Sequence, residues 1–355
     1  MAEHGVGESP RLQIVFLGTA PFAVPTLRAL AQPVRVEAAG TLRLRSGQAL
    51  RQAQGKPAAL PYEIASVITR PDRPAGRGRK PRASPVKLAA QEIGLPVLQP
   101  ERVSEEPGYS LLRELSPDVL LVVAFGELLS EKALSLPRIA AVNLHASLLP
   151  KYRGAAPIQR AILAGEQETG VTAQWMALTL DAGDIILQRS LSIGAEEDFG
   201  SLHDRLAQLA AQVALATVEL LSEGAAPRRP QQVDGISYAP PIRRHELVLD
   251  WQEEAPSILR LIRTFAPHPG ARTTRAGRLL KILSARQDAD DGPEGDREGA
   301  GTPGRIVEVT KEGFWVKAGK GRVLVLRVQP EARAAMSAGD YVKGYRLAVG
   351  EQLGR

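Results

Sequence analysis

The first two thirds of the chain alternate short apolar runs with amphipathic stretches. Residues 13–17 have the composition of a buried strand, and a Gly-Thr-Ala-Pro turn follows, leading into an amphipathic helix through Phe22, Val24, Leu27 and Leu30. The same patterns predict strands at 34–38, 64–69, 119–125, 141–144, 170–176 and 185–192 and helices at 86–93, 111–115 and 201–221. Strands that alternate with helices predict an α/β domain over residues 11–224, with a mostly parallel sheet covered on both faces.

The pattern changes near residue 225, where two prolines and two arginines mark a linker that we place at 225–240. Beyond it, one helix at 257–264 precedes short, punctuated strands at 279–283, 304–309, 313–317 and 322–328. This pattern predicts a small β-barrel domain over residues 241–355. Residues 287–301 are acidic and rich in glycine, which indicates a solvated loop within this domain.

One segment interrupts the first domain. Residues 41–60 carry four basic residues and no acidic ones, between a predicted helix and the next strand. We interpret this segment as an inserted surface loop; disorder and nucleic-acid binding are both open readings, and disorder is the one we favour.

Composition narrows the possible classes. The chain has 355 residues, a net charge of +6 and no cysteine, which excludes disulfides, zinc–thiolate sites and thiol nucleophiles. The first ten residues contain no apolar signal core, and the apolar run at 119–125 is too short to span a bilayer. We therefore expect a soluble, cytoplasmic protein without a membrane partner.

Two polar side chains end one of the predicted strands. Asn143 and His145 are two residues apart, so they point to the same face, at the carboxyl end where open α/β sheets bind ligands. An amide and an imidazole there are suited to stabilising an oxyanion and transferring a proton. A hydrogen-bonded core histidine explains the same spacing. The first strand–turn–helix lacks Gly-x-Gly-x-x-Gly, which disfavours a dinucleotide enzyme.

A second polar stretch lies in a glycine turn before the strand at 185–192. It holds two carboxylates, Asp181 and Asp184, and the capping of an Asx turn accounts for either of them. The alternative is that one carboxylate reaches His145, orients its ring and stabilises the imidazolium form.

The order of several motifs gives a more specific signal than any one of them. Asn143-x-His145 is followed by Ser-Leu-Leu-Pro at 147–150 and by Leu-Asp-x-Gly-Asp at 180–184. Together these resemble the folate-dependent formyltransferase family. Further blocks extend the likeness from about residue 11 to residue 353, in the pattern of the members that formylate methionyl-tRNA: 70–80, 84–87, 153–160, 168–172, 238–239, 249–251, 277–282 and 329–330.

The resemblance implies a function and a set of site residues. It implies a Rossmann-like formyltransferase domain and an OB-like C-terminal domain that contacts tRNA. The formyl donor would be 10-formyltetrahydrofolate, with no metal, and the acceptor the α-amino group of methionyl initiator tRNA, attacked without a covalent enzyme intermediate. The implied catalytic residues are Asn143, His145 and Asp181, and the implied folate-binding residues are Ser147, Leu148, Leu149 and Pro150.

A basic loop bears on the choice of acceptor. Residues 70–87 contain seven basic residues and one acidic residue, interleaved with proline and glycine, so the loop is suited to a phosphate backbone. The resemblance implies tRNA contacts through Arg73, Arg77, Arg79 and Lys80. A solvated loop without a partner is the alternative for the charge pattern alone.

Two rival functions remain at this point. An enzyme that formylates an amino-sugar nucleotide or a glycinamide ribonucleotide would keep the three chemical residues. It would not need the basic loop together with a C-terminal domain that carries nine basic and four acidic residues between 241 and 286. A tRNA-binding protein that has lost catalysis would have no need of Asn143, His145 and Asp181. We expect a monomer.

Overall fold

The structure is a computed structural model that describes residues 11–32, 61–75, 80–287 and 302–354. Its chain forms two compact units. Unit 1 comprises residues 1–145, 171–189 and 207–231, and unit 2 comprises 146–170, 190–206 and 232–355. The expected strand at 34–38, the insertion at 41–60 and most of the loop at 287–301 lie outside the described residues.

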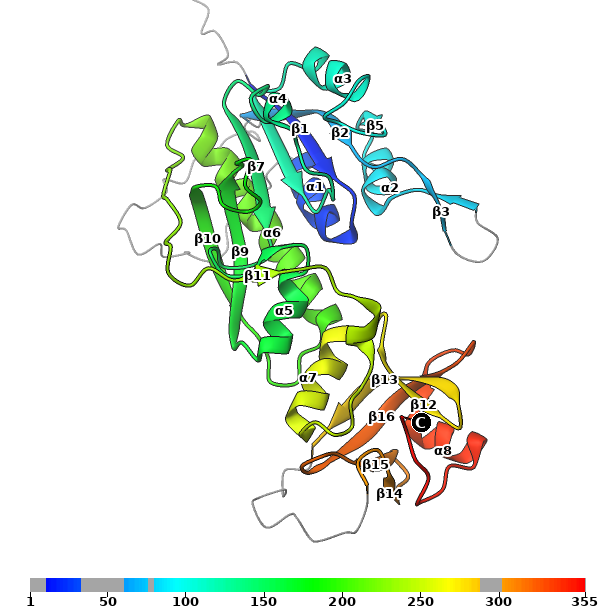
Figure 1. Cartoon of the computed structure of the whole chain (residues 1–355). Helices are drawn as coiled ribbons and strands as arrows, with labels where there is room; N and C mark the ends of the chain where they lie inside the picture. The colour runs from blue at the N-terminus through cyan, green and yellow to red at the C-terminus, as the bar shows by residue number, and fades with distance from the viewer. Residues whose placement is uncertain (1–10, 33–60, 76–79, 288–301, 355) are drawn as a thin grey trace, which may run out of the picture. The chain divides into compact units, whose positions relative to one another are not determined.

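The first part of the chain, coloured from blue to green in Figure 1, supplies a seven-stranded sheet. Apart from β8 and α5, whose bounds follow below, this part of the chain contains β1 (Leu12–Gly18), η1 (Pro21–Ala23), α1 (Val24–Ala31), β2 (Tyr62–Ile68), β3 (Arg73–Ala75), β4 (Lys80–Arg82), α2 (Pro85–Glu92), β5 (Val97–Leu98), α3 (Gly108–Glu114), β6 (Val119–Val123), α4 (Glu131–Leu134), β7 (Ala140–His145), β9 (Glu168–Trp175), β10 (Ile185–Ser192) and α6 (Phe199–Ser222).

The strand order in this sheet is β10-β9-β7-β6-β1-β2-β5. The pairs β2–β5, β1–β2, β1–β6 and β6–β7 are parallel, whereas β7 and β9 are antiparallel. Four successive residues of β1, Ile14 to Leu17, are fully buried, so both faces of this strand are covered. A strand covered on both faces is continuously apolar, which is the pattern that predicted it. The mixed α/β fold with a mostly parallel sheet is thus confirmed.

The C-terminal region holds a separate, wholly antiparallel sheet. The remaining elements of the chain, in order, are β8 (Arg153–Gly154), α5 (Pro157–Ala164), β11 (Tyr238–Ala239), η2 (Arg244–Leu247), α7 (Ala255–Phe265), β12 (Ala271–Arg275), β13 (Arg278–Arg286), β14 (Ile306–Val309), β15 (Phe314–Lys317), β16 (Arg322–Pro330), β17 (Met336–Ser337) and α8 (Ala338–Tyr345). The strand order β12-β13-β16-β15-β14, with β17 beside β16, is consistent with the expected small barrel.

The core of this sheet includes apolar side chains of the preceding helix. Ile258 and Ile262 of α7 are one turn apart and belong to the same buried cluster as Ile282, Phe314 and Val325 of the strands. Strand β12 was not predicted, because its sequence Ala-Arg-Thr-Thr-Arg has no apolar alternation. It forms a hairpin with β13 through Ala276 and Gly277, which both have positive φ, as a tight hairpin turn requires.

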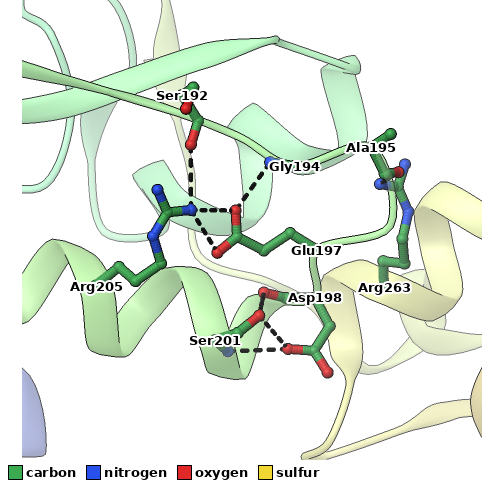
Figure 2. A network of polar contacts seen from close by, with 8 residues as sticks. All are labelled: Ser192, Gly194, Ala195, Glu197, Asp198, Ser201, Arg205 and Arg263. Atoms are coloured by element: carbon green, nitrogen blue, oxygen red, sulfur yellow. Dashed lines mark hydrogen bonds and ion pairs between the residues drawn. The ribbon is translucent and has the colours of Figure 1, made fainter.

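A polar network joins the loop before α6 to helix α7 within unit 2 (Figure 2). Arg205 donates to both carboxylate oxygens of Glu197, at 2.7 and 2.8 Å, and Glu197 also accepts from the backbone N–H of Gly194 at 2.9 Å. Asp198 accepts from the backbone of Ser201 in the first turn of α6, and Arg263 of α7 donates to the carbonyl of Ala195. These bonds fix the entry into α6.

In the part of the chain that the structure describes, no helix combines the length and the apolar character needed to cross a membrane.

Candidate active site

Strand β7 carries the first two candidate residues into unit 1. Asn143 is half-buried and the His145 residue is 6% exposed, and the residue between them, Leu144, faces the opposite side of the sheet. Backbone pairing with β6 and β9 fixes the position of Asn143, and pairing with Thr172 of β9 fixes that of His145. The strand therefore presents an amide and an imidazole side by side, as the sequence pattern predicted.

The third candidate, Asp181, lies in a tight turn between β9 and β10. Its φ is +52°, a left-handed conformation that Asp tolerates better than most residues. Gly183 completes the turn, where a Cβ would lie 1.7 Å from the carbonyl oxygen of Trp175. Only glycine fits there, so the Asp-x-Gly-Asp spacing has a steric cause.

The structure brings these three side chains together. The Asn143 Nδ2 donates to Asp181 Oδ1 at 3.3 Å, and His145 Nδ1 lies 3.5 Å from Asp181 Oδ2. The His145 and Asp181 side chains are each 6% exposed. The predicted convergence of an amide, an imidazole and a carboxylate is therefore present, and of the two carboxylates in the turn it is Asp181 that faces the ring. Their catalytic roles stay predictions.

Sequence reasoning missed a further amide at this site. Gln174 of β9 is the antiparallel partner of Asn143, and its Nε2 donates to Asp181 Oδ1 at 2.9 Å. Directly opposed residues in an antiparallel pair project from the same face, so both amides reach one carboxylate. The parallel pairing that the pattern favoured would not have placed Gln174 there.

The segment after α6 returns to the same sheet and closes the turn that holds Asp181. Arg229 forms a backbone bridge with Ile185, and the Trp175 indole donates to the carbonyl of Pro227 at 2.9 Å. The guanidinium of Arg228 stacks 3.7 Å from the centre of the Trp175 ring. This anchoring places Gln231 against the turn, and its Nε2 donates to the Asp181 carbonyl at 2.9 Å.

The candidate folate-binding residues 147–150 follow β7 directly along the chain and belong to unit 2. Ser147 is fully buried and donates through its hydroxyl to the carbonyl of Lys151 at 2.6 Å, while Leu149 is 3% exposed. Leu148 and Pro150 are half-buried. These contacts give the loop a defined conformation, and its role in folate binding stays a prediction.

The basic loop is described in part. Arg73 lies in β3, which pairs with β4, and its guanidinium forms an ion pair with Glu101 at 2.5 Å. Asp72 accepts from Gln99 and Lys87, and these bonds hold the pKa of its carboxyl below the usual range. Lys80 opens β4, whereas Arg77 and Arg79 lie outside the described residues. All four tRNA contacts stay predictions.

Family models and named relatives match most of this chain. The family models for formyl transferase and for its C-terminal domain match residues 43–218 and 241–346. Methionyl-tRNA formyltransferase of Moorella thermoacetica is 46% identical over 343 residues, which cover 97% of this chain and 99% of the relative. The protein of the same name from Methylococcus capsulatus is 43% identical over 346 residues, which cover 97% and 100% of the two chains.

Solved structures of low sequence identity share the fold. WlaRD, a sugar 3N-formyl transferase, has a TM-score of 0.59 at 17% identity and covers 92% of this chain and 100% of its own. HypX from Aquifex aeolicus, solved with tetrahydrofolic acid, has a TM-score of 0.58 at 15% identity over 96% of this chain. The match spans 48% of HypX, about half its length. Taking the matched family models and the full-length relatives together, this chain belongs to the formyl transferase family.

Proposed function

We propose that this enzyme transfers a formyl group from 10-formyltetrahydrofolate to the α-amino group of methionyl initiator tRNA. The observation that carries the proposal is the contact of half-buried Asn143 and buried His145 with buried Asp181, in a chain that is 46% identical to a methionyl-tRNA formyltransferase over 97% of its length. Initiation of translation places this reaction in the cytoplasm.

The chemistry needs a group that moves a proton. An α-amino group has a pKa near 8, so a useful fraction is neutral and nucleophilic at physiological pH. Its nitrogen attacks the formyl carbon and must lose a proton, while the folate nitrogen that leaves must gain one. His145 accepts the first proton and supplies the second, so the new C–N bond and the broken one balance without a covalent enzyme intermediate.

Asp181 sets the form of the imidazole that does this work. Its Oδ2 faces His145 Nδ1, and a carboxylate at that position favours the tautomer with the proton on Nδ1. The lone pair then lies on Nε2, the nitrogen that takes the proton from the amine. When the ring takes up the proton, the buried carboxylate stabilises the imidazolium.

Asn143 supplies a donor for the oxyanion. An amide carries two N–H bonds, and its contact with Asp181 at 3.3 Å occupies one of them. We assign the second N–H to the oxygen that becomes negative when the amine attacks. Donors of this kind typically lower the barrier by about 3–4 kcal/mol.

The basic loop at 70–87 supports tRNA as the acceptor, because a substrate without a long phosphate backbone has no use for seven basic residues in such a segment. Purified enzyme with 10-formyltetrahydrofolate should formylate methionyl-tRNA and not a dTDP-linked amino sugar or glycinamide ribonucleotide. Turnover of either small acceptor at the tRNA rate would contradict the proposal, and so would a failure to formylate methionyl-tRNA. Light scattering on the same sample tests the expected monomer.

A further inference from the structure

The Asp181 carboxylate is held by a partner outside the predicted group. Gln174 lies 2.9 Å from this carboxylate, closer than Asn143 at 3.3 Å and His145 at 3.5 Å. Gln174 is 2% exposed. A buried hydrogen bond of this length has good geometry, while the other two contacts are longer than most hydrogen bonds. Gln174 is therefore the stronger restraint on the carboxylate.

The restraint matters because a carboxylate rotates easily. The torsion that turns the two oxygens of an Asp side chain has a broad, shallow profile. With Oδ1 bonded to Gln174, the carboxylate plane is fixed and Oδ2 is directed at His145 Nδ1. Without that donor, the contact from Asn143 at 3.3 Å would be a longer and weaker restraint on the same oxygen.

Gln231 restrains the backbone of the same residue. Its Nε2 donates to the carbonyls of Asp181 at 2.9 Å and Gly183 at 2.8 Å, and lies 3.4 Å from Gln174 Oε1. The left-handed conformation of Asp181 is unfavourable for residues other than glycine, so bonds of this kind help the turn to persist. The two glutamines thus hold the side chain and the main chain of one catalytic candidate.

We propose that Gln174 and Gln231 are positioning residues for formyl transfer. Gln174 fixes the Asp181 carboxylate against His145, and Gln231 fixes the turn from which that carboxylate projects. The inference rests on the proposed function for the reaction concerned. Both residues act through Asp181, and neither is assigned a contact with substrate.

A double-mutant cycle tests whether Gln174 acts through Asp181. Gln174→Met keeps the length of the side chain and removes the donor; we expect kcat to fall about tenfold while KM for folate and for tRNA stays within about twofold. Asp181→Gly removes the carboxylate and allows the positive φ. In that background, Gln174→Met should lower kcat by less than about twofold, because its partner is gone.

Gln13→Met is the matched control. Gln13 also lies on a strand of the sheet and donates to a carboxylate, that of Glu63, at 2.8 Å, but away from this site. It should change kcat by less than about twofold in either background. If Gln174→Met lowers kcat by the same factor with and without Asp181, or acts on KM alone, the positioning role is wrong.

Two changes at Gln231 separate donation from shape. Gln231→Met should lower kcat about fivefold, with the same loss of effect in the Asp181→Gly background. Gln231→Glu keeps the shape but sets an acceptor against two carbonyl oxygens, so it should be at least as impaired as Gln231→Met. Recovery of wild-type kcat by Gln231→Glu would show that the side chain fills space and does not position the turn.

A measurement independent of the acceptor separates this inference from the proposed function. Nitrogen-15 NMR of the His145 ring, assigned with a His145→Gln sample, should show the proton on Nδ1 in the wild type and in Gln13→Met, and a mixture of tautomers in Gln174→Met. If Gln174→Met shows this mixture but the wild-type enzyme does not formylate methionyl-tRNA, the proposed function is wrong and the positioning role stands. Full turnover with unchanged ring signals in Gln174→Met would defeat the positioning role alone.

Discussion

Two shielded carboxylates in this molecule are held in opposite ways. The Glu197 side chain is 9% exposed, and both of its oxygens accept from the guanidinium of Arg205, as Figure 2 shows. The Asp181 side chain is 6% exposed, and its described contacts are two amides and an imidazole. Glu197 is neutralised by a permanent cation, whereas the partner of Asp181 gains charge only when His145 is protonated.

From this difference we infer that Glu197 is a structural carboxylate, and we propose that Asp181 is a chemical one, which takes part in the reaction. A carboxylate paired with arginine is satisfied at every stage of a reaction and stabilises the fold. A carboxylate beside a neutral imidazole is most strongly stabilised when the ring becomes charged, so its contribution grows as a proton moves. The following predictions test this contrast, from the largest expected effect to the smallest.

Removing the imidazole gives the largest effect. We expect His145→Ala to lower kcat at least about a hundredfold, because general acid–base catalysis contributes that much. Binding of tRNA, measured by filter retention, should survive. Near wild-type turnover would refute the role assigned to His145.

Neutralising the chemical carboxylate comes next. Asp181→Asn keeps the shape and tolerates the positive φ, so it should leave the melting temperature within a few degrees of the wild type. We expect kcat to fall about thirtyfold, since orienting the ring supplies part of what the imidazole contributes. A rate unaffected by Asp181→Asn would mean that His145 works without this partner.

The same carboxylate-to-amide change at Glu197 should lower stability and leave turnover almost unchanged. Glu197→Gln breaks a shielded pair with Arg205 and should lower the free energy of unfolding by about 1–3 kcal/mol, measured by urea denaturation. Turnover per folded molecule should stay within about twofold of wild type. Equal losses of activity at Glu197 and Asp181 would remove the distinction between them.

The next prediction concerns the basic loop, which we expect to affect the binding of tRNA and not the chemical step. Arg77→Ala should raise KM for methionyl-tRNA by about fivefold and reduce the salt dependence of binding, because one phosphate contact is lost. The dissociation constant for folate, from fluorescence titration, should not change. A folate-binding defect would assign this loop to the donor.

The smallest effect concerns an ion pair in the C-terminal sheet. Arg275 hydrogen-bonds Glu351 at 2.7 Å and lowers the pKa of that carboxyl below its usual 4.5. The stability from this pair is present above pH 4.5 and is lost as pH falls through the lowered pKa. Glu351→Gln should therefore cost about 1 kcal/mol at pH 7, and its melting temperature should approach the wild-type value in acid. A constant difference across this range would contradict the linkage.

Strong local patterns made much of the fold predictable. Strand β6 is apolar at every position because both faces are covered, and the long helix α6 has a clear apolar side. Strand β12 was not predictable because only Thr273 and Ala271 of its five residues are buried. The antiparallel direction of β9 relative to β7 was not predictable for another reason. After a long connection, the local sequence does not indicate whether a strand pairs parallel or antiparallel.

The candidate site also contains some residues that the sequence predicted and others that it did not. Asn143, His145 and Asp181 stood out through motif order, and their contacts were a matter of geometry that the turn at Gly183 fixes. Gln174 and Gln231 are ordinary polar residues in sequence, one on a strand and one after a proline-rich stretch. Their importance depends on the register of β7 with β9 and on a contact 50 residues away in the chain.

The antiparallel register of β7 and β9 also bears on how new specificities could be built. His145, the last residue of β7, is paired with Thr172 of β9. The segment between them therefore leaves the sheet at the end of β7 and rejoins it beside that end, so it forms a long loop whose two ends are held together. Lengthening such a loop carries only a small entropic penalty. Segments exchanged here between relatives with different acceptors should leave β7 in register, so we propose this position as a graft site for engineering.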